Sequence, residues 1–225
     1  HAGEAVLNEI APSGFRHYEQ SLRIVNILES TSSRQGLNLT HEVRDGIKNH
    51  STGKVLLLGR EGKTAETREG QILSICDAIA YINHDIDDAL RAKIITRDDL
   101  PQHPISVLGD SASKRINTMV GGLIRGSQSG NVAMEIEVRD ATNALREYLY
   151  REVYPCPAIS REVEKAKRVI HQLYDHITAH PEDHTTYHPT DDSVEQKAID
   201  TIASMTDQYA LELYQKLFFP DTRNT

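Results

Sequence analysis

The stretch that decides the fold is residues 67–93, TREGQILSICDAIAYINHDIDDALRAK. Its apolar residues recur at alternating spacings of three and four, which is the period of one face of an α-helix. The residues of this apolar face are Ile72, Ile75, Ile79, Ile82, Ile86 and Leu90. The pattern predicts one long helix whose apolar side is buried.

Working outward from this helix, the other strongly periodic segments also have the helical period. Helices are expected at residues 15–30, 39–50, 113–125, 132–154, 160–179 and 194–217, with Thr40 as a helix N-cap. Residues 55–58 fit either a buried strand or a linker, and the prolines at 101 and 104 predict a loop over 97–109. No alternating β pattern occurs, so the expected fold class is all-α. The break at Pro155-Cys156-Pro157 separates a domain of residues 1–155 from a helical extension of residues 156–225.

Composition narrows the class of protein. The 225 residues are 38% hydrophobic but only 5% aromatic, with no Trp, which suits a core of Leu, Ile, Val and Ala between helices. The net charge of −8 argues against non-specific nucleic-acid binding. Cys76 and Cys156 are far apart and are expected to be reduced. Without an apolar run long enough to span a membrane, the expectation is a cytoplasmic protein with no membrane partner.

The polar side of the 67–93 helix carries the candidate chemistry. Asp77, Tyr81, His84 and Asp88 recur at helical spacing, with Asp85 beside His84. At 1.5 Å per residue they form a ridge roughly 16 Å long, which could hold a divalent metal at one end and sugar hydroxyls further along. A solvated acidic face is the alternative. Tyr81 and the apolar run around it favour burial on most sides.

Five segments, in order along the chain, resemble the bacterial dGTPase-like family of HD-type phosphohydrolases. Residues 1–4, HAGE, resemble the end of the family's HDxGHxPFGHxGE segment, and residues 15–24, FRHYEQSLRI, resemble its EQSLRI block. Residues 36–43, GLNLTHEV, followed by His50-Ser51, resemble its GLNLTxEV…HS block. Residues 70–89 resemble its second metal-binding segment, and residues 202–210, IASMTDQYA, resemble its closing helix with Ser204 in place of a Gly. The resemblance implies an HD-domain helical bundle with a C-terminal helical extension.

The resemblance implies one metal ligand in this chain. Asp77 matches the family's distal Asp, while the His and the His-Asp pair that complete the ligand set match segments that would precede His1. The implied ion is Mg, Mn, Fe or Ni, with Mg also bound to the substrate triphosphate.

It also implies roles for residues near the reacting bond. His1 matches a histidine that protonates the leaving 5′ oxygen, Glu4 matches the acid that orients it, and His17 is either a catalytic neighbour or a structural histidine. Tyr81 is expected beside the sugar and the α-phosphate, where its ring would exclude a 2′-hydroxyl. Asp85 is expected to accept a hydrogen bond from the 3′-hydroxyl.

A triphosphate needs cations beyond the metal. Lys54, Lys114 and Arg115 are candidates, the last two because they open a helix.

The histidines at 176, 180, 184 and 188 recur every fourth residue, which suggests a metal site, but the prolines at 181 and 189 and the polar composition favour a mobile loop.

The expected function is metal-dependent hydrolysis of deoxynucleoside triphosphates to deoxynucleoside and inorganic triphosphate. The alternatives are an HD-type 5′-nucleotidase or cyclic-nucleotide phosphodiesterase, and a non-catalytic nucleotide-sensing subunit of an oligomer. We expect a homo-oligomer, with an allosteric nucleotide as an open question and no stable nucleic-acid partner. Lacking the other metal ligands, the 225 residues by themselves are expected to be inactive.

Overall fold

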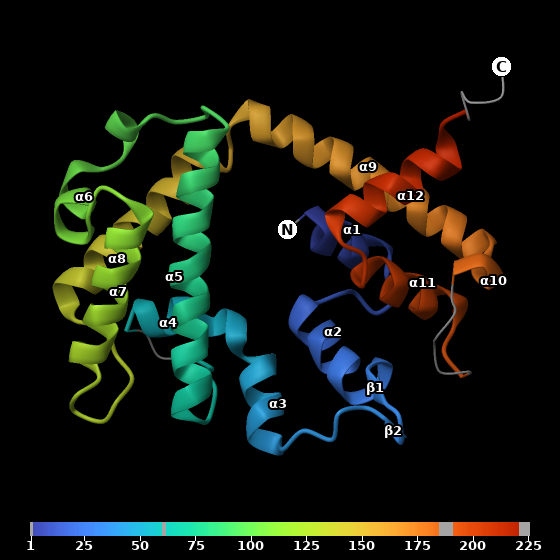
Figure 1. The fold of residues 1–225 in the computed structure, drawn as a ribbon, viewed down its shortest axis with the longest axis horizontal. Helices are drawn as coiled ribbons and strands as arrows, with labels where there is room; N and C mark the ends of the chain where they lie inside the picture. The colour runs from blue at the N-terminus through green and yellow to red at the C-terminus, as the bar shows by residue number, and fades with distance from the viewer. Residues whose placement is uncertain (1, 60–61, 185–190, 221–225) are drawn as a thin grey trace. The chain divides into compact units, whose positions relative to one another are not determined.

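The secondary structure is almost entirely helical (Figure 1). The structure, a computed structural model, describes residues 2–59, 62–184 and 191–220. Within these ranges the one strand pair is a short antiparallel hairpin, β1 (Ser30–Thr31) and β2 (Arg34–Gln35), with Ser30 opposite Gln35. The all-α prediction is therefore confirmed.

The chain forms two compact units. Unit 1 consists of residues 1–38 and 161–225, and unit 2 of residues 39–160. The helices of unit 1 are α1 (Ala2–Ile10), α2 (His17–Arg23), the π-helix η1 (Ile24–Leu28), most of α9 (Pro157–Ala179), α10 (Pro181–His184), α11 (Val194–Ala203) and α12 (Asp207–Phe218). Those of unit 2 are α3 (His41–Lys48), η2 (His50–Thr52), α4 (Gly53–Leu57), α5 (Arg68–Arg91), η3 (Arg97–Asp99), α6 (Gln102–Leu108), α7 (Ala112–Gly126), α8 (Ile136–Tyr148) and the π-helix η4 (Leu149–Val153). The predicted domain boundary at residue 155 stays a prediction.

Helix α5 is the centre of unit 2 and matches the predicted helix closely. Thr67 caps it by accepting a hydrogen bond from the Gly70 N–H at 3.1 Å. Its apolar face is buried at four consecutive positions, Ile75, Ile79, Ile82 and Ile86, while Ile72 near the start is exposed. Figure 1 shows α7 and α8 alongside α5, and their core residues, such as Met119 and Leu145, pack with the α5 isoleucines. The predicted cap at Thr40 is also present, on α3.

Unit 1 has its own core. Leu7 of α1, Leu173 and Ile177 of α9, Ile199 of α11 and Leu213 of α12 pack together. None of the helices among the described residues is long and apolar enough to cross a membrane.

Three local predictions were wrong or incomplete. Residues 53–57 form the short helix α4 rather than a strand or linker, with Leu57 fully buried. Residues 97–109 hold η3 and α6 rather than a loop, because Pro104 lies in the first turn of α6, where its missing N–H costs no intrahelical hydrogen bond. The predicted helix at 194–217 is two helices, since Thr206 caps a new one by accepting from the Tyr209 N–H at 3.2 Å.

Candidate functional site

Glu4 and His17 form a hydrogen-bonded pair in unit 1. Nδ1 of His17 lies 3.0 Å from both carboxylate oxygens of Glu4, and the His17 backbone N–H donates to Oε1 at 3.1 Å. His17 opens α2, and the preceding Arg16 provides no side-chain cap. The carboxylate of Glu4 thus satisfies an open N–H group of α2 and also orients the His17 ring.

The turn between α1 and α2 makes this pairing possible. Asn8 accepts a hydrogen bond from the Phe15 N–H at 3.0 Å, and Gly14 adopts a left-handed conformation with φ of +77°. The chain therefore reverses tightly and returns His17 to Glu4. The resemblance implies that Glu4 orients His1, and that pairing stays a prediction because His1 lies outside the described residues. Among the described residues, Glu4 is paired with His17.

The charge on Glu4 is stabilised by its partner. Burial opposes the charged form, but the hydrogen bonds and charge of His17 hold the pKa of Glu4 below its ordinary value. Glu4 is therefore a carboxylate at neutral pH. A carboxylate fixed to one ring nitrogen of a histidine selects the tautomer and orientation of that ring, which is the arrangement that acid–base catalysis uses.

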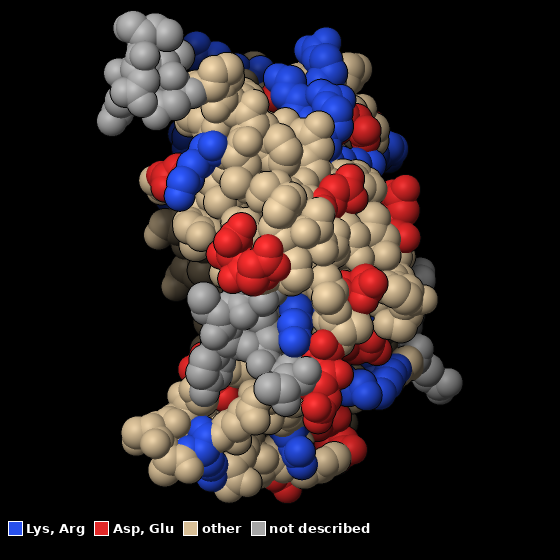
Figure 2. Space-filling model, turned by 90° about the vertical axis from the view of Figure 1, so that its right-hand side faces the viewer, with Lys and Arg blue, Asp and Glu red and all other residues tan. Residues whose placement is uncertain are grey.

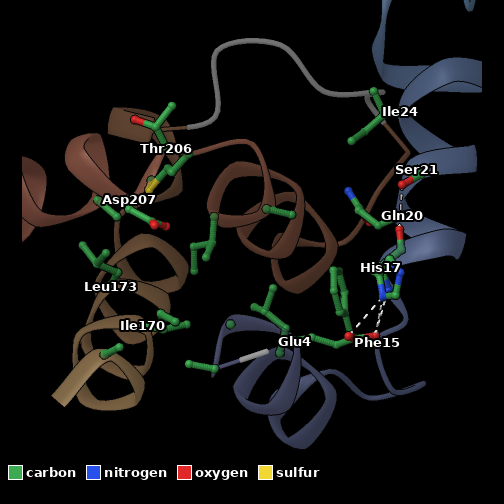
Figure 3. Close-up of a pocket in the computed structure, with 18 residues that line it drawn as sticks. Glu4, Phe15, His17, Gln20, Ser21, Ile24, Ile170, Leu173, Thr206 and Asp207 are labelled. Atoms are coloured by element: carbon green, nitrogen blue, oxygen red, sulfur yellow. Dashed lines mark hydrogen bonds and ion pairs between the residues drawn. The ribbon is translucent and has the colours of Figure 1, made fainter. Parts of the chain in front are cut away.

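The Glu4–His17 pair lies on the wall of a pocket of about 720 Å³ in unit 1. Figure 3 shows the pair on one side of this pocket, with Ile170 and Leu173 of α9 across from it and Thr206 and Asp207 further round. Most of the wall is apolar. Polar residues line it where α1 and α2 meet, and also at Thr206 and Asp207 at the start of α12. The pocket thus combines an apolar interior with one acid–base pair.

In unit 2, the polar ridge of α5 lies opposite its buried isoleucines, as predicted. Asp77, His84 and Asp88 are exposed, whereas Tyr81 and Asp85 are half-buried. Tyr81 and Asp85 are half-buried because they contact residues at the end of α8 and around η4. The alternative interpretation, a solvated acidic face, therefore applies only to the exposed part of the ridge.

Asp85 accepts a hydrogen bond from the hydroxyl of Tyr154 at 2.5 Å. Tyr150 packs edge-on against Tyr154 with ring centroids 5.0 Å apart, and it is hydrogen-bonded to Tyr81. Burial first, and then Asp85 and the neighbouring phenols, raise the pKa values of Tyr81 and Tyr154 well above the ordinary range. These three residues, Tyr81, Tyr150 and Tyr154, are called the tyrosine cluster below, and Tyr81 and Tyr154 remain neutral hydroxyls.

Arg146 lies beside the tyrosine cluster. The guanidinium carbon of Arg146 lies 5.6 Å from the centroid of the Tyr150 ring. Arg146 is only 2% exposed, and it forms an ion pair with Glu147. Its buried Nε–H has no hydrogen-bond partner among the described residues. A buried guanidinium with an unsatisfied donor has the chemistry to bind an anion.

The sequence interpretation missed Arg146, Tyr150 and Tyr154. A signal was available, because the three recur every fourth residue in the segment predicted as a helix over 132–154. The π-helix η4 continues this helix with a hydrogen bond from the Tyr154 N–H to the Leu149 carbonyl at 2.9 Å. Wider turns of this kind are frequent at functional sites, and their effect on side-chain direction is not encoded in a simple helical period.

The predicted phosphate-binding cations have other contacts. Arg115 is buried, donating from Nε to Asn83 at 2.8 Å and from a terminal nitrogen to Asp87 at 3.1 Å. Its burial lowers the pKa of Arg115, and Asp87 opposes that shift. Lys114 is exposed and forms an ion pair with Asp110, and Lys54 is exposed on α4. A substrate role for these three residues stays a prediction, and the contacts of Arg115 favour a structural role instead.

Asp77 is an exposed carboxylate on α5. Within residues 2–59, 62–184 and 191–220, no group of three or more His, Cys, Asp or Glu side chains is arranged to hold a metal ion. An exposed carboxylate oxygen is a suitable ligand for a hard divalent cation, but one ligand alone does not make a site. Metal binding by Asp77 therefore stays a prediction.

Comparison with known proteins identifies the class. Residues 132–216 match the model of the phosphohydrolase-associated domain. Three relatives carry the name deoxyguanosinetriphosphate triphosphohydrolase-like protein. The relative from Caldanaerobacter subterraneus is 45% identical over 98% of this chain and 63% of its own length. Those from Thiobacillus denitrificans and Bordetella pertussis are each 30% identical over 97% of this chain and 70% of their own length.

The chain belongs to the dGTPase-like family of the HD superfamily. The resemblance drawn from the sequence motifs is thereby confirmed. The chain spans 63% of the length of the Caldanaerobacter relative, so these residues correspond to part of such a protein.

Proposed function

We propose that the intact protein hydrolyses deoxynucleoside triphosphates to a deoxynucleoside and inorganic triphosphate. In this reaction a water oxygen bonds to the α-phosphorus and the bond from phosphorus to the 5′ oxygen breaks. The leaving 5′ oxygen takes a proton, and the triphosphate leaves intact. Membership of the dGTPase-like family supports this proposal.

The observation that carries the proposal is the Asp85–Tyr154 hydrogen bond beside Tyr81. One oxygen of Asp85 is held by Tyr154, which fixes the direction of the carboxylate. We propose that Asp85 accepts a hydrogen bond from the sugar 3′-hydroxyl and that the neutral ring of Tyr81 lies against the sugar. An aromatic wall at this point leaves no room for a 2′-hydroxyl, which gives preference for deoxynucleotides.

Arg146 extends this site toward the phosphates. Its unsatisfied Nε–H lies next to Tyr150, within the same part of unit 2 as Asp85. We propose that a triphosphate oxygen supplies the missing acceptor. In this proposal Arg146 is the arginine that binds the triphosphate, a role that the sequence interpretation gave to Arg115.

His17 is the proposed acid–base group of unit 1. Glu4 binds Nδ1, so the ring is oriented with its other nitrogen as the site of proton exchange. His1, which the resemblance matches to the leaving-group acid, keeps that predicted role. Asp77 would hold the divalent metal together with ligands from outside this chain, and a bound metal supplies Lewis-acid polarisation of a phosphoryl oxygen.

The test is product analysis with the intact protein, dGTP and Mn²⁺ or Mg²⁺. We expect deoxyguanosine and inorganic triphosphate in equal amounts by ion chromatography. Tyr154→Phe leaves the Asp85 carboxylate without its donor and should lower kcat/KM by about 10–100-fold, because a hydrogen bond to a charged group contributes roughly 1.5–3 kcal/mol. Tyr148→Phe, which removes the hydroxyl of a buried tyrosine at the end of α8, is the matched control and should change kcat/KM less than about twofold.

Other products decide between the alternatives. Release of phosphate from dGMP would assign a nucleotidase, and opening of a cyclic nucleotide would assign a phosphodiesterase. Binding of dGTP without turnover by the intact protein would assign a nucleotide-sensing subunit. The homo-oligomer, the allosteric nucleotide and the cytoplasmic location stay predictions, as does the inactivity of the 225 residues by themselves.

A further inference from the structure

Three histidines gather at the end of α9. The rings of His176 and His180 stack with centroids 4.5 Å apart and an interplanar angle of 27°, and the ring of His184 packs edge-on against His176 at 5.3 Å. The segment that carries these histidines was expected to form a mobile loop, but His176 lies on α9 and His184 on α10. Pro181 begins α10, so it does not prevent the three histidine side chains from packing together. His176, His180 and His184 are called the histidine cluster below, and His188 lies outside the described residues.

The histidine cluster contacts α12. Phe218 packs edge-on against His176 at 5.9 Å, and Tyr214 packs on Phe218 at 4.9 Å while its hydroxyl binds Gln172 of α9. These contacts continue the packing of α9 on α12 that Leu173 and Leu213 begin in the core of unit 1. Leu173 of α9 and Ala210 of α12 also line the pocket that holds the Glu4–His17 pair. The cluster therefore joins α12 to the helix that forms part of the pocket wall.

The surroundings of the histidine cluster determine how it responds to added positive charge. Nδ1 of His180 lies 3.1 Å from the His176 carbonyl oxygen, and the buried Nε2 of His184 has no hydrogen-bond partner among the described residues. Burial, followed by the charges of His180 and His184, lowers the pKa of His176, and Asp183 opposes this shift. Besides the histidines, the titratable side chains on the packed helices include Asp175 on α9, Glu182 and Asp183 on α10, and Tyr209, Glu212, Tyr214 and Lys216 on α12.

Protonation changes how these rings interact with one another. Stacked imidazoles present ring faces to each other, and no three metal-binding side chains among the described residues are arranged for an ion. Adding protons places like charges about 5 Å apart on neighbouring rings, of which those of His176 and His184 are half-buried, and this opposes their packing. Neutral rings pack favourably on one another and on Phe218.

We propose that the histidine cluster is a pH-sensitive contact that holds α12 on α9 and α10 when neutral and weakens that packing when protonated. The direction of the pH effect on stability follows from the lowered pKa of His176. The contribution to stability is complete above the unfolded-state pKa of about 6.5 and is lost as pH falls through the lower folded-state value. Acidification from about pH 7.5 to 5.5 crosses the unfolded-state pKa and so enters this window.

The test uses NMR titration of the imidazole carbons together with hydrogen exchange. In the wild-type protein we expect His176 to titrate below the ordinary histidine value. Protection factors of α12 amides, corrected for intrinsic rates, should fall severalfold from about pH 7.5 to 5.5 because protonation weakens the packing of α12. His103, exposed on α6, is the control, and His103→Gln should leave both readouts unchanged.

His176→Phe keeps an aromatic ring against Phe218 but cannot be protonated. We expect its α12 protection to be the same at both pH values and close to that of the wild type at pH 7.5. His180→Gln combined with His184→Gln should raise the pKa of His176 toward its ordinary value. The proposal is overturned if His176 titrates at or above that ordinary value, or if His176→Phe loses α12 protection on acidification as the wild type does.

Discussion

At the residue scale, Asp200 shows how a buried charge is satisfied in unit 1. Its side chain is fully buried on α11 and accepts hydrogen bonds from Gln20, Arg23 and Gln196 at 2.7–3.0 Å. Arg23 reaches it from α2 and also binds Asp192 at 2.5 Å. The two carboxylates raise the pKa of Arg23 despite its partial burial, so the cation is held between α2 and α11.

Removing this cation should be costly. Arg23→Met removes the guanidinium that pairs with the buried Asp200 carboxylate, and we expect the free energy of unfolding to fall by about 3–5 kcal/mol. Urea unfolding at pH 7 measures the change. Lys165→Met removes the exposed pair with Glu162 on α9 and should cost less than about 1 kcal/mol. Similar losses for the two variants would contradict the role given to Arg23.

At the element scale, α7 and α8 meet at a pair of adjacent glycines. A side-chain carbon on Gly122 would lie 2.8–3.0 Å from three atoms of Val138, a buried residue of α8. The same carbon on Gly121 would meet only the flexible end of Arg125 at 3.0 Å. The close approach of the two helices therefore depends on Gly122 and not on Gly121.

Opposite effects are expected from alanine at these two positions. Gly122→Ala forces the helices apart and should lower the free energy of unfolding by about 1–3 kcal/mol. Gly121→Ala removes unfolded-state entropy and should raise it by about 0.4–1 kcal/mol. Thermal and urea unfolding of both variants provide the comparison. A stabilising Gly122→Ala would show that α7 and α8 are packed less closely than described.

Helix boundaries illustrate what local sequence predicts at this scale. Thr40 and Thr67 were expected at helix starts, and both accept hydrogen bonds from helix N–H groups. The helix α6 was missed because Pro104 was treated as a breaker, although a proline in the first turn removes no hydrogen bond. The difference between a proline that ends a helix and one that begins it depends on position within the turn.

At the scale of the whole molecule, two hydrophobic cores correspond to two units. Every residue of the larger core, from Leu57 to Val153, lies within unit 2, which is one continuous stretch of chain. Unit 1 is built from two separate stretches, residues 1–38 and 161–225. A continuous stretch with its own core meets the usual requirement for independent folding.

We expect residues 39–160 to fold when expressed separately. Far-UV circular dichroism should show a helical protein, and urea should unfold it in one cooperative transition. Leu145→Ala, which removes a fully buried side chain from this core, should lower the urea midpoint by an amount corresponding to about 2–5 kcal/mol. A fragment that is helical but unfolds without cooperativity would show that unit 2 needs unit 1 to pack its core.

The sequence by itself determined the all-α class, the long helix α5 with its buried isoleucine face, and the family, because helical period and motif order are local properties of the chain. It also indicated the ridge of Asp77, Tyr81 and Asp85 on that helix.

Only the tertiary structure decided which side chains the candidate site residues contact. Tyr154 binds Asp85 across 69 positions of sequence, and Glu4 pairs with His17 across 13 positions. Arg115 illustrates the same limit. Its position at a helix start suggested that it binds phosphate, but it is buried against Asn83 and Asp87, and that burial depends on how α5 and α7 pack. A residue's spacing fixes its side of a helix, but its partner is set by another element that folds against that side.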